Sequence, residues 1–251
     1  MKKISLLITI GMIMIGGCAS ISPNKMKDNL KYYSVEDKET KPVVFILPGS
    51  GGGHGGRSYS WARWFSSLGI ASVMIDSAKV RGRRQLFGIN YGGDLSPALE
   101  VVSENSNIDS KHYAVIGFSR GGTAALESAS YLKESQPKPD FIFSLYPGDK
   151  GLCPNSHEEP TKVLVFYGEK DSWGTYQGNR NACKRMANWH DNTTFYLLKN
   201  AKHGYDGTWN GKWNCCGGRT FENAHNKKAL EKTRALIFEV ISKKWKIEKN
   251  K

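Results

Sequence analysis

The sequence contains no internal repeat and no long low-complexity segment, which argues against solenoid and fibrous classes of protein. It also has few acidic residues, with 23 Asp and Glu against 36 Lys and Arg and a formal net charge of +13. The basic residues are scattered apart from local runs at 79–84 and 243–251, and aromatic residues do not interleave with them as in a nucleic-acid groove. We therefore expect attraction to anionic envelope surfaces and no binding of nucleic acid.

The overall composition is that of an ordinary soluble domain. Hydrophobic residues make up 39% of the 251 residues and charged residues 24%. A chain of this length commonly forms one α/β domain and has enough apolar material for a full core.

The first residues resemble a secretion signal. A basic start, Met1 to Lys3, precedes an apolar run at residues 4–15 that is too short to predict a membrane span. Small residues then lead to Cys18, as in a bacterial lipobox, where the cysteine is lipidated; the alternative is a plain signal peptide cut nearby. We expect a signal peptide at 1–17, a polar tether at 18–40, a folded domain at 41–251, and a lipid-anchored location in the bacterial cell envelope.

Export would place the remaining cysteines in an oxidising compartment. Cys153, Cys183, Cys215 and Cys216 can form two disulfides in three possible connectivities. A bond between the adjacent Cys215 and Cys216 would be strained, so a distant partner is expected for each. The alternative is a metal site with His203 or His225 among its ligands. No Cys-x-x-Cys pair supports that alternative, and we predict no metal.

Apolar runs alternate with segments of helical periodicity along the rest of the chain. Continuous apolar runs predict buried strands at 42–47, 70–75, 113–116, 141–146, 163–167 and 194–198. Helices are predicted at 59–68, 95–104, 123–132 and 221–245. This order predicts an α/β fold with a mostly parallel sheet and helices on both faces. The functional site should then lie at the carboxyl ends of the strands.

The stretch at 117–122, Gly-Phe-Ser-Arg-Gly-Gly, has the layout of a nucleophile elbow. It follows a predicted strand and precedes a predicted helix, and it places Ser119 on the turn between them. Gly117 and Gly121, two residues to either side, would let the strand and the helix pack closely around that turn. The alternative is an ordinary turn whose serine caps the helix.

A nucleophilic serine needs a base and an acid that orients the base. His203 follows the strand at 194–198, on the same rim as Ser119. His190 precedes that strand and so lies at the wrong end of the sheet, and His225 falls within the predicted final helix. We therefore expect His203 to be the base.

The acid should lie between the serine and the histidine in the sequence. Asp171 follows the strand at 163–167 and is our first candidate, with Asp149 second. Glu169 is nearer the strand end, and we expect its side chain to point elsewhere. Asp171 can also be interpreted as a residue that forms a turn.

The developing negative charge of an acyl-transfer reaction needs two backbone N–H groups. We expect one from Arg120 and the other from the glycine-rich loop at 48–56, preferably Ser50 and next Gly51. A phosphate loop is the competing interpretation of these glycines. The required Gly-x-x-x-x-Gly-Lys-[Ser/Thr] pattern is missing.

Taken together, these segments resemble the dienelactone hydrolase family of α/β-hydrolases over roughly residues 42–245. The resemblance rests on five segments, at 47–52, 76–82, 117–122, 168–173 and 202–206. It implies a Ser119–Asp171–His203 triad that acts on an ester or a similar acyl bond, with no cofactor. It also loosely implies a Cys153–Cys183 disulfide.

The sequence departs from the family pattern at two positions. The founding dienelactone hydrolases use a cysteine nucleophile, and this chain has Ser119, which favours a general serine esterase over a dienelactone substrate. Many α/β-hydrolases have His-Gly before the oxyanion residue, where this chain has Pro48-Gly49. That position contributes backbone geometry, so activity need not be lost.

We therefore expect a serine hydrolase that cleaves a small-molecule ester through an acyl-enzyme. The alternatives are a peptidase or thioesterase of the same fold, and a non-catalytic envelope lipoprotein that uses the fold for binding. Four aromatic residues near the predicted rim could line an aromatic or acyl pocket, although packing explains them about as well: Trp173, Tyr205, Trp209 and Trp213. Arg81, Arg83 and Arg84 could meet an anionic substrate, but we favour a solvated basic loop.

Overall fold

The computed structural model describes residues 21–33, 40–148, 153 and 160–247. The predicted signal peptide, Cys18 and Asp149 lie outside these residues, so the structure does not bear on them.

A seven-stranded sheet forms the centre of the fold, in the order β1-β3-β2-β4-β5-β6-β7. All neighbouring strands are parallel except β1, which runs antiparallel to β3. The predicted, mostly parallel sheet is therefore confirmed. Its central strands are continuous apolar runs because both of their faces are covered. The strands are β1 Leu30–Tyr33, β2 Lys41–Leu47, β3 Ala71–Ile75, β4 Ile108–Phe118, β5 Phe141–Leu145, β6 Lys162–Gly168 and β7 Thr193–Leu198.

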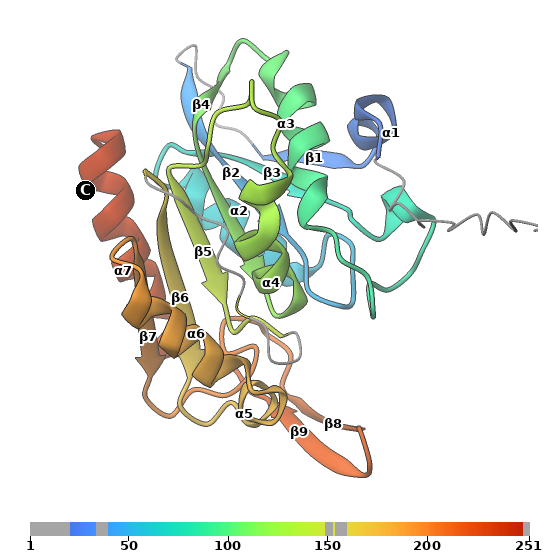
Figure 1. The fold of residues 1–251 in the computed structure, drawn as a ribbon, viewed down its shortest axis with the longest axis vertical. Helices are drawn as coiled ribbons and strands as arrows, with labels where there is room; N and C mark the ends of the chain where they lie inside the picture. The colour runs from blue at the N-terminus through green and yellow to red at the C-terminus, as the bar shows by residue number, and fades with distance from the viewer. Residues whose placement is uncertain (1–20, 34–39, 149–152, 154–159, 248–251) are drawn as a thin grey trace, which may run out of the picture.

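Helices cover both faces of this sheet (Figure 1). The α3 and α4 helices lie in front of it in this view, and α2 lies behind. The Arg234 side chain of α7 donates to Ser60 of α2, so these two helices pack together. The helices are α1 Pro23–Lys27, α2 Gly56–Ser66, α3 Leu95–Ser103, α4 Arg120–Glu127, α5 Ser172–Gln177, α6 Asn179–Trp189 and α7 Lys227–Trp245, with short 3₁₀ turns at Lys79–Arg81, Gly92–Asp94 and Ser128–Tyr131.

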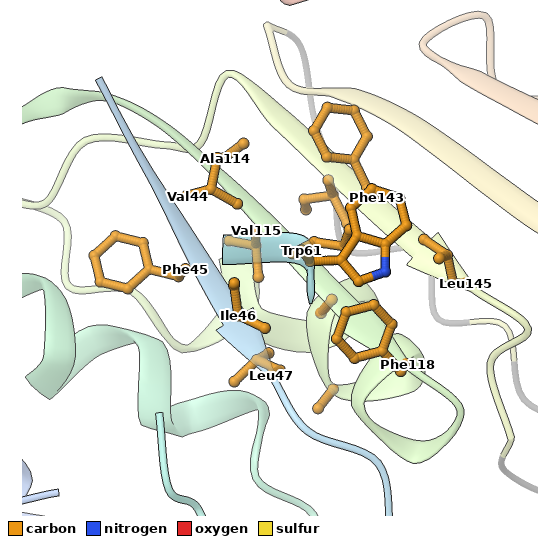
Figure 2. Close-up of a cluster of buried hydrophobic side chains, with 14 of the residues drawn as sticks. Val44, Phe45, Ile46, Leu47, Trp61, Ala114, Val115, Phe118, Phe143 and Leu145 are labelled. Atoms are coloured by element: carbon orange, nitrogen blue, oxygen red, sulfur yellow. The ribbon is translucent and has the colours of Figure 1, made fainter. Parts of the chain in front are cut away.

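The core between the sheet and α2 is built around Trp61 (Figure 2). Its ring lies 6.2 Å from that of Phe118, the last residue of β4. Figure 2 shows Phe143 and Leu145 of β5 beside the same indole. Trp61 is fully buried, and its Nε1 donates to Asp206 at 2.8 Å. This core therefore connects α2 to the loop that follows β7.

The folded domain begins earlier than the sequence predicts. Residues 21–33 were expected in the tether, yet they form α1 and β1, and Leu30 pairs with Ile75 at the edge of the sheet. Met26 of α1 is fully buried. The polar composition of this segment conceals the few apolar side chains that attach it to the domain.

The predicted final helix also begins too early. A hairpin of β8 Gly211–Cys215 and β9 Arg219–Asn223 occupies the start of the predicted segment, and α7 begins only at Lys227. Asn226 is the N-cap, and its side chain accepts from the backbone N–H of Ala229. His225 therefore lies before the helix. In Figure 1 the arrows of β5 and β7 point toward one end of the sheet, and the hairpin projects beyond that end.

The described residues contain two disulfides. Cys153 pairs with Cys183 at 2.04 Å, as the family resemblance implied. Cys215 pairs with its neighbour Cys216, so the expectation of distant partners is wrong. Cys215 ends β8 and Cys216 begins the turn of the hairpin, and the other two cysteines among the described residues are bonded to each other.

Candidate active site

Ser119 lies on the sharp turn between β4 and α4, with φ 53° and ψ −118°. The flanking glycines are needed because backbones meet here. An added Cβ at Gly117 would lie 1.9 Å from the Gly121 carbonyl oxygen, and one at Gly121 would lie 2.3 Å from that of Pro48. The close packing predicted around the elbow is therefore present. Ser119 is the N-cap residue of α4, but its side chain makes no capping hydrogen bond.

The Ser119 hydroxyl is instead directed at an imidazole. Ser119 Oγ lies 3.0 Å from His203 Nε2, and His203 Nδ1 lies 3.0 Å from Asp171 Oδ2. His203 is 6% exposed and Asp171 is fully buried. Because a carboxylate can only accept, Nδ1 carries the proton and Nε2 is left to accept from the serine. The three side chains singled out in the sequence thus form one hydrogen-bonded chain.

Asp171 has a second partner as well as His203. Its Oδ1 accepts from the backbone N–H of Gly174 at 2.9 Å and caps α5. The turn-forming interpretation of this residue and the orienting one therefore apply together. Glu169 points elsewhere, as predicted, and its carboxylate accepts from the N–H of Asn200.

The remaining charged candidates lie away from this chain of hydrogen bonds. His225 bonds the Gly207 carbonyl oxygen through Nδ1. Arg81 forms a two-point ion pair with Asp94, at 2.6 and 2.7 Å, which accounts for its charge without a ligand. Arg83 and Arg84 are exposed.

The glycine-rich loop after β2 lies against the Ser119 turn. Gly49, Ser50 and Gly51 line the same cleft as Ser119 and His203. Hydrogen bonds hold the loop: the Tyr91 hydroxyl donates to Pro48 O, and the Leu86 N–H donates to Ser50 O. Arg120 is the first residue of α4, and its backbone N–H belongs to the turn at the N-terminus of that helix.

The cleft beside Ser119 has a volume of about 500 Å³. Three of the four aromatic residues considered in the sequence, Trp173, Trp209 and Trp213, line it. Tyr205 does not, because it is fully buried and hydrogen-bonded to Thr233. Phe87 and Asn223 also line the cleft, and sequence reasoning found neither of them.

A buried polar cluster supports the histidine from behind. Asp206, 3% exposed, accepts from Trp61 Nε1 and from the Tyr146 hydroxyl. Arg57 forms an ion pair with it, with Nε 3.2 Å from Oδ1. Tyr146 packs against His203 with ring centroids 4.7 Å apart. This cluster therefore joins α2, the end of β5 and the histidine loop.

The ionisation of this cluster follows from its burial. Burial raises the pKa of Tyr146 well above its ordinary value, and Asp206 raises it further against the opposing Arg57, so the phenol stays neutral and donates. Burial by itself would lower the pKa of Arg57, but the facing Asp206 carboxylate acts in the opposite direction and the pKa is raised. The Arg57 guanidinium is therefore charged where it faces the Asp206 side chain.

Sequence reasoning missed Arg57, Tyr146 and Asn223 as parts of this site. Arg57 stands just after the glycine-rich loop, which was the one local signal available for it. Asp206 was noted only as part of the segment at 202–206. Across the described residues, no group of His, Cys, Asp and Glu side chains is arranged to hold a metal ion. Within the same residues, no helix has the length and apolar character needed to cross a membrane.

Comparisons with known proteins identify the fold. No protein-family model matches this chain, and no curated protein matches it. Among solved structures, the dienelactone hydrolase-like promiscuous phosphotriesterase P91 from metagenomic libraries aligns with a TM-score of 0.63. It is 19% identical, over 85% of this chain and 91% of that one.

Two further structures show the same likeness. A putative dienelactone hydrolase of Klebsiella pneumoniae has a TM-score of 0.58 at 14% identity, over 81% of this chain and 88% of its own. The carboxylesterase Cest-2923 of Lactobacillus plantarum has a TM-score of 0.59 at 15% identity, over 88% and 94%. The predicted α/β-hydrolase fold is therefore confirmed by its likeness to dienelactone hydrolase-like proteins and a carboxylesterase.

Proposed function

We propose that this chain is a serine hydrolase that cleaves carboxylic esters through an acyl-enzyme. The observation that carries the proposal is the hydrogen-bonded chain from Ser119 through His203 to Asp171, with 3.0 Å at each step. It opens into a cleft bordered by a glycine-rich loop. The esterases among the structural neighbours support an ester as the substrate class.

In the first half of the reaction, His203 Nε2 takes the Ser119 proton while Ser119 Oγ bonds the ester carbonyl carbon. The carbonyl oxygen becomes an oxyanion, and backbone N–H groups of Arg120 and of Ser50 or Gly51 stabilise it. Asp171 stabilises the imidazolium that forms. The imidazolium then gives its proton to the alcohol oxygen as the bond from carbon to that oxygen breaks.

In the second half, water bonds the acyl carbon while His203 takes a proton from it. The bond to Ser119 Oγ breaks, and the serine recovers its proton from the imidazolium. One water is consumed, and one carboxylic acid and one alcohol leave. No residue changes its oxidation state, and no cofactor enters the balance.

A non-catalytic binding protein on the same fold is the alternative from a different class. It would not need the Ser119 hydroxyl to be within hydrogen-bonding distance of a buried imidazole that a carboxylate orients. A peptidase or a thioesterase would use the same three side chains. Its leaving group, an amine or a thiol in place of an alcohol, would distinguish it from an esterase.

Labelling with a fluorophosphonate probe tests the proposal. We expect the wild type to be labelled and Ser119→Ala to remain unlabelled. Ser130→Ala is a matched control, because Ser130 is exposed and its hydroxyl donates to the Glu127 carbonyl oxygen, away from the cleft. A wild type that stays unlabelled where a control esterase is labelled would overturn the proposal. Hydrolysis of p-nitrophenyl esters of increasing chain length then measures how long an acyl group the cleft accepts.

We further propose that the mature chain is anchored in the bacterial cell envelope through lipidated Cys18. The support is the lipobox-like sequence and the pairing of cysteines expected in an oxidising compartment. We expect the full chain to fractionate with membranes and Cys18→Ser to be released from them. Equal membrane association of both would contradict lipidation at this position.

A further inference from the structure

Trp209 is an exposed residue of the cleft whose indole packs against the backbone. It lines the cleft and is 52% exposed. Its six-membered ring lies against the backbone of Gly211, where an added Cβ would stand 2.6 Å from Cζ2 and 2.8 Å from Cε2. The missing side chain of Gly211 is therefore what makes room for the ring.

Trp209 begins a row of aromatic rings that leads to the imidazole. Its centroid is 6.3 Å from that of Trp213, and Trp213 is 6.0 Å from both Trp173 and His203. Phe87 lines the same cleft and is 66% exposed. A substrate that extends from Ser119 along this row would therefore rest against indole.

A polar group stands among these rings. Asn223 lines the cleft, and its Oδ1 is buried with no hydrogen-bond partner among the described residues. Its backbone bridges to that of His203, which places the residue next to the imidazole. A purely apolar ligand would leave this oxygen unpaired, and a buried unpaired acceptor is unfavourable. The site therefore fits a ligand that offers hydroxyl donors.

The charge of the cleft favours a neutral ligand. Among the residues that line the cleft, Arg57 is the one with a permanent charge. Asp206 compensates this charge, because its Oδ1 lies 3.2 Å from Arg57 Nε. A ring face for stacking, hydroxyl groups for hydrogen bonds and no net charge are together the properties of a neutral sugar.

Resting on the proposed ester hydrolysis, we infer that the substrate is an acyl ester of a carbohydrate, with the sugar as the alcohol part. The C–H face of the sugar ring stacks on Trp209, and a sugar hydroxyl donates to Asn223 Oδ1. Hydrolysis breaks the bond between the acyl carbon and the sugar oxygen. It consumes one water and releases a carboxylic acid and the free sugar hydroxyl.

The test compares three acetates that share one acyl group: a methyl xyloside with a single acetyl group and its other hydroxyls free, ethyl acetate and phenyl acetate. We expect the wild type to have a higher kcat/KM for the sugar acetate than for ethyl acetate, because both release an alkyl alcohol. Loss of stacking in Trp209→Ala should lower the ratio of kcat/KM for the sugar acetate to that for ethyl acetate about ten-fold. Asn223→Ala should lower the same ratio and should change the ratio for phenyl acetate less.

Trp189→Ala is the matched control, because Trp189 is 75% exposed on α6 and does not line the cleft. We expect it to keep the wild-type ratios. Thermal unfolding of each variant shows that it is folded. Gly211→Ala provides a second variant, because the added methyl group displaces the Trp209 ring without removing it, and it should lower the ratio in the same direction.

The outcomes separate this inference from the proposed function. If Ser119 is labelled and ethyl acetate is hydrolysed, but the sugar acetate is no better a substrate, the inference fails and the hydrolase assignment stands. If phenyl acetate depends on Trp209 and Asn223 as strongly as the sugar acetate does, an aryl ester replaces the sugar. If no probe labels Ser119, the proposed function fails, and the inference fails with it.

Discussion

The Tyr146 ring packs edge-on against the His203 imidazole, with 4.7 Å between the ring centroids. Tyr146 adopts φ 40°, a left-handed conformation in which non-glycine residues are uncommon, and its hydroxyl donates to Asp206. The imidazole is thus oriented by Asp171 at its Nδ1 edge and packed by Tyr146 on its side. Both contacts leave Nε2 directed at Ser119.

Two substitutions of Asp171 separate its orienting role from its capping role. Asp171→Asn should lower kcat by about 10³–10⁴-fold, since an amide can hold the wrong tautomer of His203. Its free energy of unfolding should stay within about 0.5 kcal/mol, because Asn caps helices as well as Asp does. Asp171→Ala should lose the same activity and about 1 kcal/mol more stability through the lost cap. Kinetics and urea unfolding measure the two effects.

Loss of the orienting acid should lower kcat far more than about ten-fold. If Asp171→Asn retained more than about a tenth of the wild-type kcat, the acid would therefore lie elsewhere. Asp149 would then be the next residue to substitute.

Removing Asp206 should destabilise the protein through the charge it leaves behind. In Asp206→Ala the partly buried Arg57 guanidinium loses its counter-ion, and we expect a cost of about 3 kcal/mol in the free energy of unfolding. This is the lower end of the range for buried pairs, because the Arg57 side chain is 25% exposed. Tyr146→Phe should cost about 1.5–3 kcal/mol, the value of one hydrogen bond to a charged group. Urea unfolding of both variants provides the comparison. If Asp206→Ala lowered the free energy of unfolding by less than Tyr146→Phe does, the ion pair would contribute little to stability.

Substitution of Gly117 tests the packing at the elbow. The added methyl group in Gly117→Ala would meet backbone atoms of Gly121 at 1.9 and 2.3 Å, and backbone cannot rotate away as a side chain can. We expect a loss of about 3 kcal/mol or more in the free energy of unfolding. Gly56→Ala is the control, because an added Cβ there has no neighbour within 4 Å. It should change stability by no more than about 0.5 kcal/mol. Similar losses of stability in Gly117→Ala and Gly56→Ala would show that the backbones do not approach closely at Gly117.

His54 should make stability depend on pH. Burial lowers its pKa below the ordinary value near 6.5, Lys31 and Lys79 lower it further, and Asp76 opposes them. Below about pH 6.5 the unfolded chain takes up a proton that the folded His54 resists, so stability falls as the pH drops through this range toward the folded pKa. His54→Gln should therefore gain stability relative to the wild type between pH 7 and pH 5. An equal difference at both pH values would show that His54 is not the group responsible.

The order of motifs in the sequence was enough to predict where Ser119, His203 and Asp171 would meet. Each follows the carboxyl end of a parallel strand, and such ends share one rim. The β8–β9 hairpin could not be predicted, because Phe221 fits the apolar period of the helix that follows. Asp206 bonds Trp61 across 145 positions of sequence, and no local pattern reveals such a partner. The fold at 21–33 was missed because few apolar residues attach it to the domain.

The β8–β9 hairpin leaves and rejoins the fold at neighbouring points. Gly211 pairs with Asn223, and the N–H of Asn226 donates to the Tyr205 carbonyl oxygen at 2.9 Å. A segment closed off in this way can be lengthened, shortened or exchanged without moving either of its anchors. Diversification of this one hairpin, in nature or in a designed library, would therefore remodel the indole wall of the cleft while Ser119 and Asp171 stay where they are.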